Sequence, residues 1–199
     1  DEGHIAALSF DITDTDGNVR QMLGHITDAV NQLGELSSTI LDVEKPDKLA
    51  WTRYQLKKEL ESVIGLIMPR NSAFSVEFSI PERMEIRADR VRFRQVFLNL
   101  AKNALDAMGE EGTLHIEARG IDGAVEIRFR DTGPGIGAKE ARRIFEPYFT
   151  TKKDSGGTGF GLPIVKQIVE AHGGTIVVTA EMKQGAEFVI AIPQRERTE

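Results

Sequence analysis

Two asparagines and an aspartate form a polar stripe that can hold a metal ion. Asn99, Asn103 and Asp106 follow one another at spacings of four and three residues, which places them on one side of a helix. A carboxamide oxygen is a neutral, hard ligand, and Mg²⁺ usually keeps only a few protein oxygens beside phosphates and water. The stripe therefore suits a magnesium ion at Asn103, although asparagines on a solvated helix face would give the same pattern.

A second candidate segment is the run 131–136, Asp-Thr-Gly-Pro-Gly-Ile, directly after an alternating strand pattern. Gly133 and Gly135 permit positive φ or a close backbone approach, and the proline between them stiffens the turn. The carboxylate of Asp131 at the strand end can accept a hydrogen bond from an adenine amino group. An ordinary Gly-Pro-Gly turn remains the alternative.

The third segment is glycine-rich and precedes a helix. Residues 156–162 read Gly-Gly-Thr-Gly-Phe-Gly-Leu, and glycines at a helix N-terminus let backbone N–H groups point at phosphate. The run matches neither the Walker phosphate loop nor the dinucleotide fingerprint. A flexible linker would not explain why a helix pattern begins at once. Just upstream, Phe149 can anchor a mobile lid, and Lys152 or Lys153 can reach phosphate oxygens as point charges.

Helices and strands alternate in the order that these segments require. Asp89 is the expected N-cap of a long helix over 90–108 that ends at Gly109. Residues 55–67 and 163–172 read as further helices. Alternating strand patterns occupy 74–80, 114–119, 125–129, 175–180 and 187–192. With antiparallel strands, this order predicts an α+β fold, a two-layer α/β sandwich.

The N-terminal part has a different pattern. Apolar residues at steps of three and four over 16–43 indicate an amphipathic helix that packs on another helix, and Pro46 ends the pattern. We therefore expect two parts, a helical dimerisation segment over 1–46 and a catalytic domain over 47–199. The chain opens on Asp1 rather than methionine, so we expect a fragment of a longer protein.

Taken together, the motifs resemble the catalytic domain of sensor histidine kinases, in the gyrase, Hsp90, histidine kinase and MutL superfamily. Residues 95–104 are similar to its N box, 131–136 to its first glycine box, 145–152 to its F box and 157–162 to its second glycine box. Residues 185–188 resemble a weakened last glycine motif. The sequence Glu-Pro-Tyr-Phe-Thr-Thr-Lys at 146–152 is most similar to that of kinases of the nitrogen-regulation type.

This resemblance implies the Bergerat ATP-binding fold, with adenine on Asp131 and Mg²⁺ on Asn103, and Asn99 nearby as the second catalytic residue. The implied ATP contacts are Asn103, Asp106, Asp131, Gly133, Gly135, Ile136, Phe149, Lys152, Gly157, Thr158, Gly159, Phe160, Gly161 and Leu162.

Phosphoryl transfer is favoured over hydrolysis. The superfamily's ATP hydrolases carry a glutamate four residues before the magnesium asparagine, and the residue here is Asn99. An amide is no general base at neutral pH. The resemblance therefore implies transfer of the γ-phosphate of ATP to a histidine, for relay to a response-regulator receiver domain.

The phosphoacceptor is the missing part. His4 and His25 lack the acidic residue that follows the acceptor in the family's H box, so we expect the acceptor upstream of Asp1, with His25 as the weaker alternative. We expect His115 and His172 to be structural, with a positive charge favourable on His172 at a helix C-terminus.

The composition limits which classes of binding partner the chain can have. A net charge of −6 argues against a general nucleic-acid binder, and zero cysteines with no long apolar run fit a cytoplasmic chain without a membrane segment. We expect a homodimer through 16–43. Two other interpretations stay open: an atypical scaffold that does not phosphorylate itself, and a serine kinase of the anti-sigma-factor type.

Overall fold

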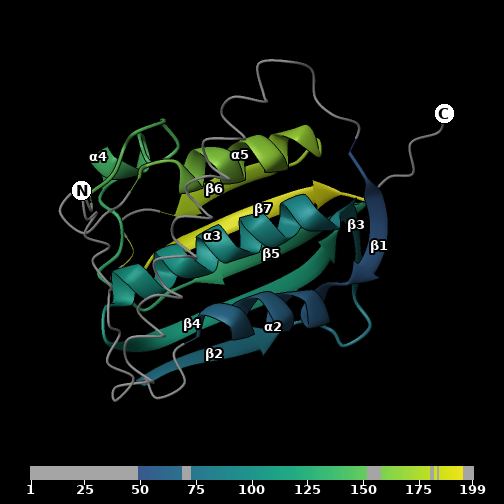
Figure 1. Ribbon diagram of the computed structural model, residues 1–199, viewed down its shortest axis with the longest axis horizontal. Helices are drawn as coiled ribbons and strands as arrows, with labels where there is room; N and C mark the ends of the chain where they lie inside the picture. The colour runs from purple at the N-terminus through teal and green to yellow at the C-terminus, as the bar shows by residue number, and fades with distance from the viewer. Residues whose placement is uncertain (1–48, 69–72, 152–157, 180–181, 183, 195–199) are drawn as a thin grey trace, which may run out of the picture. The chain divides into compact units, whose positions relative to one another are not determined.

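The computed structural model describes residues 49–68, 73–151, 158–179, 182 and 184–194. The expected helix over 16–43, both N-terminal histidines, Lys152 and Gly157 lie outside these residues. Within them, a layer of helices covers one face of a five-stranded sheet (Figure 1). The expected two-layer α+β fold is confirmed. No helix in this part of the chain has the length and apolar composition needed to cross a membrane.

The sheet has the strand order β2-β4-β5-β7-β6. Its strands are β2 (Ala73–Ser79), β4 (Glu111–Ile121), β5 (Ala124–Arg130), β6 (Thr175–Thr179) and β7 (Glu187–Pro193). Three neighbouring pairs are antiparallel, as expected, but β2 and β4 run parallel. This differs from the all-antiparallel prediction because the chain between β2 and β4 crosses over through a helix, and parallel neighbours require such a connection.

Two short strands were not predicted. β1 (Trp51–Gln55) pairs antiparallel with β3 (Glu85–Asp89) in a separate two-stranded sheet. Each has only five residues. β1 shows no apolar alternation, and β3 alternates, with Ile86 and Ala88 buried, over a run too short to be recognised. The pair matters for the site because β3 runs directly into the helix that carries the asparagines.

That helix, α3, spans Arg90–Met108 with the bounds that the sequence predicts. The carboxylate of Asp89 accepts hydrogen bonds from the N–H groups of Val91 and Arg92, which satisfies two of the free donors at the helix start. Gly109 ends the helix with φ 78°. The cap and the stop together fix the register in which Asn99 and Asn103 face the site.

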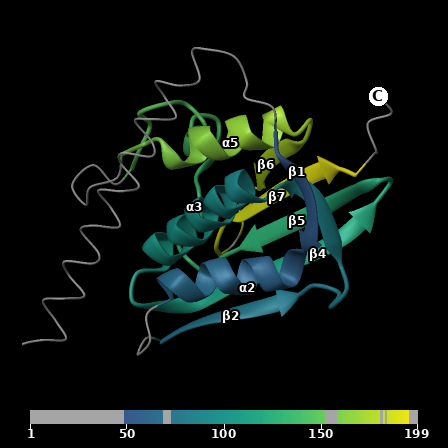
Figure 2. The same cartoon turned by 45° about the vertical axis from the view of Figure 1, so that its right-hand side comes forward.

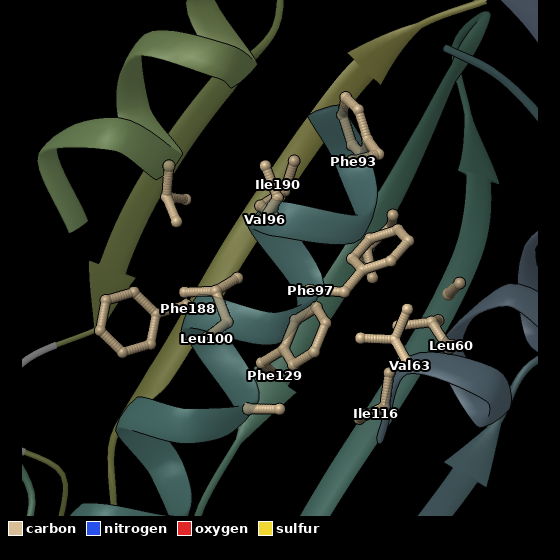
Figure 3. Packing of buried hydrophobic residues seen from close by; sticks show 14 of the residues in the cluster. Leu60, Val63, Phe93, Val96, Phe97, Leu100, Ile116, Phe129, Phe188 and Ile190 are labelled. Atoms are coloured by element: carbon tan, nitrogen blue, oxygen red, sulfur yellow. The ribbon is translucent and has the colours of Figure 1, made fainter. Parts of the chain in front are cut away.

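The apolar side of α3 forms the centre of the core (Figure 3). The ring of Phe97 lies 5.6 Å from Phe93, edge to face, and 6.2 Å from Phe129 of β5, nearly stacked. α2 (Leu56–Ile67) and α5 (Gly161–Ala171) flank α3 on the same face of the sheet (Figure 2). Fully burying a large apolar side chain contributes about 1.5–3 kcal/mol, so α3 is firmly anchored.

His172 has a structural role, but its charge differs from the expectation. It follows α5 and is buried, with its Nδ1 2.7 Å from the carbonyl oxygen of Ile168. Its Nε2 accepts the N–H of Asp89, so the ring is neutral with the proton on Nδ1. Burial lowers the pKa of His172, an effect that the Ile168 carbonyl and the charge of Asp89 only partly oppose. The expected cation at this helix end is therefore wrong.

Candidate nucleotide-binding site

The polar stripe of α3 faces the start of α5. The Nδ2 of Asn99 donates a hydrogen bond to the carbonyl oxygen of Gly161, the first residue of α5, at 3.3 Å. Asn103 lies one helical turn further along the stripe and is half-buried, whereas Asp106 is exposed. Of the three predicted residues, Asn99 contacts the start of α5, Asn103 is half-buried one turn further along α3, and Asp106 is exposed.

Asp131 is held in one orientation. It follows β5 directly and is only 5% exposed. Its Oδ1 accepts hydrogen bonds from the N–H groups of Gly133 at 2.9 Å and Ala186 at 3.2 Å. A carboxylate fixed in this way presents its acceptor oxygens in a constant direction, which suits recognition of an amino group.

Gly185 packs tightly against the first glycine segment, residues 131–136. Its φ is +76°, its N–H donates to the carbonyl oxygen of Gly133 at 2.8 Å, and a Cβ there would overlap the carbonyl oxygen of Asp131. Gly135, with φ +85°, approaches Gly185 so closely that a Cβ would lie 2.8 Å from its oxygen. The sequence marks Gly185 only as part of a weakened motif, and it is absent from the expected ATP contacts.

Both glycine segments touch α3, two turns apart. A Cβ on Gly133 would lie 3.2 Å from the backbone of Ala107, and one on Gly161 would lie 3.8 Å from the Cγ of Asn99. Eight residues of helix separate these contacts by about 12 Å. Asn103 lies midway between them, on the helix stripe that joins the Asp131 segment to the start of α5.

α5 begins at Gly161, two residues before the expected Pro163. The first N–H groups of a helix have no intrahelical acceptor, and the positive end of the helix dipole favours anions there. Ahead of the helix, Thr158 Oγ1 accepts the N–H of Phe160 at 3.4 Å, and Gly159 has φ +72°. Leu162 is half-buried and packs against the core. The start of α5 therefore offers free backbone N–H donors beside glycines that have no side chain.

Two other predicted contacts are engaged with the protein itself. The guanidinium of Arg143 lies 4.5 Å from the ring centre of Phe149, a cation–π contact. Ile136 is half-buried and packs against the core. Their contact with a nucleotide stays a prediction.

A cavity of about 280 Å³ is lined by Asp131 and Thr132. Its other lining residues are His115, Glu117, Arg130 and Gln184. It includes neither asparagine of α3 and nothing from the start of α5. The cavity shares only Asp131 with the predicted nucleotide contacts.

Comparison with known families places the chain in a family of ATPases. The profile of the family described as "Histidine kinase-, DNA gyrase B-, and HSP90-like ATPase" matches residues 88–196, more than half of the chain. The chain belongs to this family. Its fold and relatives further define it as a catalytic domain of the histidine-kinase type.

Two relatives of known name are kinases. The chain is 35% identical over 185 residues to the sensor histidine kinase ZraS of Klebsiella oxytoca, covering 91% of this chain and 40% of that protein. It is 30% identical over 172 residues to sporulation kinase D of Bacillus subtilis (strain 168), covering 84% and 34%. The chain therefore spans less than half the length of these relatives.

Solved structures of histidine kinases have the same fold. The catalytic domain of histidine kinase ThkA aligns with a TM-score of 0.66 at 33% identity, over 72% of this chain and 95% of that one. Full-length ShkA in complex with AMPPNP gives a TM-score of 0.69 at 30% identity, over 87% and 38%. ThkA in complex with the response regulator protein TrrA gives 0.68 at 28%, over 92% and 54%.

Proposed function

We propose that this chain is the ATP-binding catalytic core of a two-component sensor histidine kinase. In this role it transfers the γ-phosphate of ATP to a histidine, from which the phosphate passes to a response regulator. The observation that carries the proposal is the hydrogen bond from Asn99 to Gly161. It places an amide, and no carboxylate, where the α3 stripe meets the start of α5.

The position of Asn99 bears on the reaction. An amide cannot take a proton from water at neutral pH, so the site lacks a base at the position where the superfamily's hydrolases carry one. Phosphoryl transfer depends chiefly on positioning and charge neutralisation. Asn99 supports positioning, because it ties α3 to the first turn of α5 and leaves that turn's donors for phosphate oxygens.

The residues present fit ATP and Mg²⁺. The fixed carboxylate of Asp131 suits the adenine amino group, and the backbones of Gly133 and Gly135 leave no room for side chains where the base would approach. Asn103 supplies a neutral oxygen ligand between the two glycine segments. Mg²⁺, when bound there, would neutralise charge on the phosphates.

The acceptor and the partners follow from the family. The acceptor histidine lies upstream of Asp1 in this proposal, with His25 as the alternative, and 16–43 forms part of a homodimeric helical hairpin on the cytoplasmic side. A solved complex of a related kinase with a response regulator protein supports a receiver domain as the partner.

Calorimetric titration of ATP, with and without Mg²⁺, tests the proposal. We expect Mg²⁺-dependent binding by the wild type and its loss in Asn103→Ala. Lys58→Ala is the control, because Lys58 is an exposed residue of α2 away from the stripe. Absence of nucleotide binding by the wild type would overturn the proposal and leave the scaffold interpretation.

Chemical stability of the transferred phosphate separates the remaining interpretations. Radiolabelled ATP is incubated with the full-length protein and with its His25→Gln variant. Phosphohistidine is labile to acid and stable to alkali. An acid-stable label would instead indicate a serine kinase, and loss of the label in His25→Gln would identify His25 as the acceptor.

A further inference from the structure

Tyr148 has a backbone conformation that its side chain does not explain. Its φ is 65°, a left-handed value that is an outlier for a bulky aromatic residue. Asp122, the other non-glycine residue with positive φ in the described part, belongs to an Asp-Gly hairpin turn where such values are favoured. The side chain of Tyr148 is 72% exposed, so burial of the ring does not force this conformation.

The backbone of Tyr148 instead packs on Gly159. The N–H of Tyr148 donates to the carbonyl oxygen of Gly159 at 3.1 Å. Gly159 is itself left-handed, and a Cβ there would lie only 2.7 Å from the carbonyl carbon of Tyr148. The absence of a side chain at Gly159 therefore permits this close approach to the left-handed backbone of Tyr148.

The ring of Tyr148 adds a second contact to the same segment. It meets the ring of Phe160 edge to face, with the centroids 4.7 Å apart and the planes at 69°. Phe160 is the N-cap residue of α5, and its carbonyl oxygen accepts the N–H of Ile164. Tyr148 thus contacts the two residues that immediately precede α5.

The first turn of α5 is consequently held from two sides. Tyr148 holds Gly159 and Phe160, while Asn99 holds the carbonyl oxygen of Gly161. The donors of this turn can point in one direction only while both contacts persist.

From this geometry we infer that Tyr148 is a positioning residue for the phosphate chain of the nucleotide. It acts through Gly159 and Phe160, fixing the start of α5 against Asn99, and it does not touch the adenine end at Asp131. The inference rests on the proposed function and adds a residue to the machinery of that site. A disfavoured backbone that is retained beside such a site is typical of functional constraint.

Tyr148→Asn distinguishes the contribution of the ring from that of the backbone. Asparagine tolerates the left-handed region, so the variant keeps the hydrogen bond to Gly159 and loses the ring contact with Phe160. We expect an unchanged melting temperature and ATP affinity weakened by about three- to tenfold, the equivalent of one aromatic pair. Adenosine affinity stays unchanged, because the adenine end is not affected. Tyr148→Phe, which retains the ring, restores ATP affinity.

Gly159→Ala tests the backbone approach. Leu66→Ala is the control for loss of the exposed Tyr148 ring. Leu66 is 74% exposed on α2, so its truncation removes a similarly exposed apolar side chain elsewhere. We expect Gly159→Ala to weaken ATP more than adenosine and Leu66→Ala to change neither. All affinities are measured by calorimetry on the whole chain.

The outcomes keep the two proposals apart. If the wild type does not bind ATP, the proposed function fails. If the wild type binds ATP and Tyr148→Asn binds it equally well, the positioning role is wrong and the proposed function stands. Equal weakening of ATP and adenosine would indicate a general structural role and would also overturn the inference.

Discussion

The Nε2 of His172 accepts a hydrogen bond from the backbone N–H of Asp89 at 3.0 Å. This bond joins the C-terminal end of α5 to the N-cap of α3, at the ends of the two helices that lie away from the site. Asp89 also accepts the N–H of Ala50 through Oδ2, and the ring of Trp51 packs edge to face on His172. The start of the described chain is thereby connected to α3 and α5, the two helices that carry predicted nucleotide contacts.

Protonation of His172 is expected to destabilise the fold. Only the neutral ring can accept from Asp89, and burial lowers the pKa of His172 in the folded protein. The unfolded state has a histidine pKa of about 6.5 and binds a proton first as the pH falls. The contribution of neutral His172 to the free energy of unfolding is therefore complete above about pH 6.5. It decreases as the pH falls toward the lowered pKa of the folded protein.

Urea unfolding between pH 5 and pH 8 measures this effect. His172→Gln is expected to lose the histidine's part of the acid-side decrease, while His115→Gln, at a half-exposed ring on β4, keeps it. Equal pH dependence of the wild type and His172→Gln would contradict the neutral buried ring.

Glu59 provides a matched test of a buried charge. Its carboxylate, 3% exposed on α2, accepts from Arg90 at 2.7 Å and from Arg94 at 2.6 Å, both on α3. Burial alone would raise the pKa of Glu59, but these hydrogen bonds bring it below its ordinary value. We expect Glu59→Gln to lower the free energy of unfolding by about 1–3 kcal/mol, because charge-assisted hydrogen bonds are lost.

Glu61→Gln is the control for this change. Glu61 lies on the same helix and is exposed, so the identical substitution there is expected to change stability by less than about 0.5 kcal/mol. Both variants are compared by urea denaturation at pH 7. Similar losses in the two would show that the total charge of α2, and not the bond between α2 and α3, matters.

Strong local signals explain which parts of the fold the sequence could predict. The cap at Asp89 and the stop at Gly109 each have a direct chemical reason, and the predicted bounds of α3 are confirmed. β1 and β3 were missed because their pairing joins residues thirty or more positions apart and each strand has only five residues. The parallel pairing of β2 with β4 is equally non-local and leaves no mark in either strand.

The same distinction applies to the site. Asn99, Asn103, Asp131 and the glycines could be proposed as site residues from the sequence because their types and spacing suit the chemistry. The close packing of Gly185 on Asp131 and Gly133 could not be predicted, since it depends on a backbone approach between segments distant in the sequence. The left-handed conformation of Tyr148 is likewise a property of packing, and a tyrosine in the sequence gives no indication of it.

Gly185→Ala is expected to abolish nucleotide binding. An added Cβ would overlap the carbonyl oxygen of Asp131, so the strand end must shift and the carboxylate loses its orientation. Gly123→Ala is the control, because Gly123 has the same φ of +76° but no atom within 4 Å of the added Cβ. It therefore introduces the same backbone strain, about 1–2 kcal/mol, without the clash.

Calorimetry with ATP and a melting curve distinguish strain from clash. Both variants should melt at a lower temperature than the wild type, and only Gly185→Ala should lose ATP affinity. Retention of ATP binding by Gly185→Ala would mean that Asp131 is not fixed from this side.

Asn99→Asp changes one atom at the point where α3 meets α5. The new carboxylate cannot donate to the carbonyl oxygen of Gly161 and places a negative charge where the phosphates are proposed to lie. We expect ATP affinity to fall by about tenfold, since a hydrogen bond is replaced by two repelling acceptors. Gln95→Glu is the control, because it makes the same amide-to-carboxylate change one turn earlier on α3, about 6 Å along the helix axis from Asn99. This second variant should leave ATP affinity within about twofold. If both variants lose affinity equally, the charge of the helix and not the bond to Gly161 controls binding, and the assignment of Asn99 to the nucleotide site would be wrong.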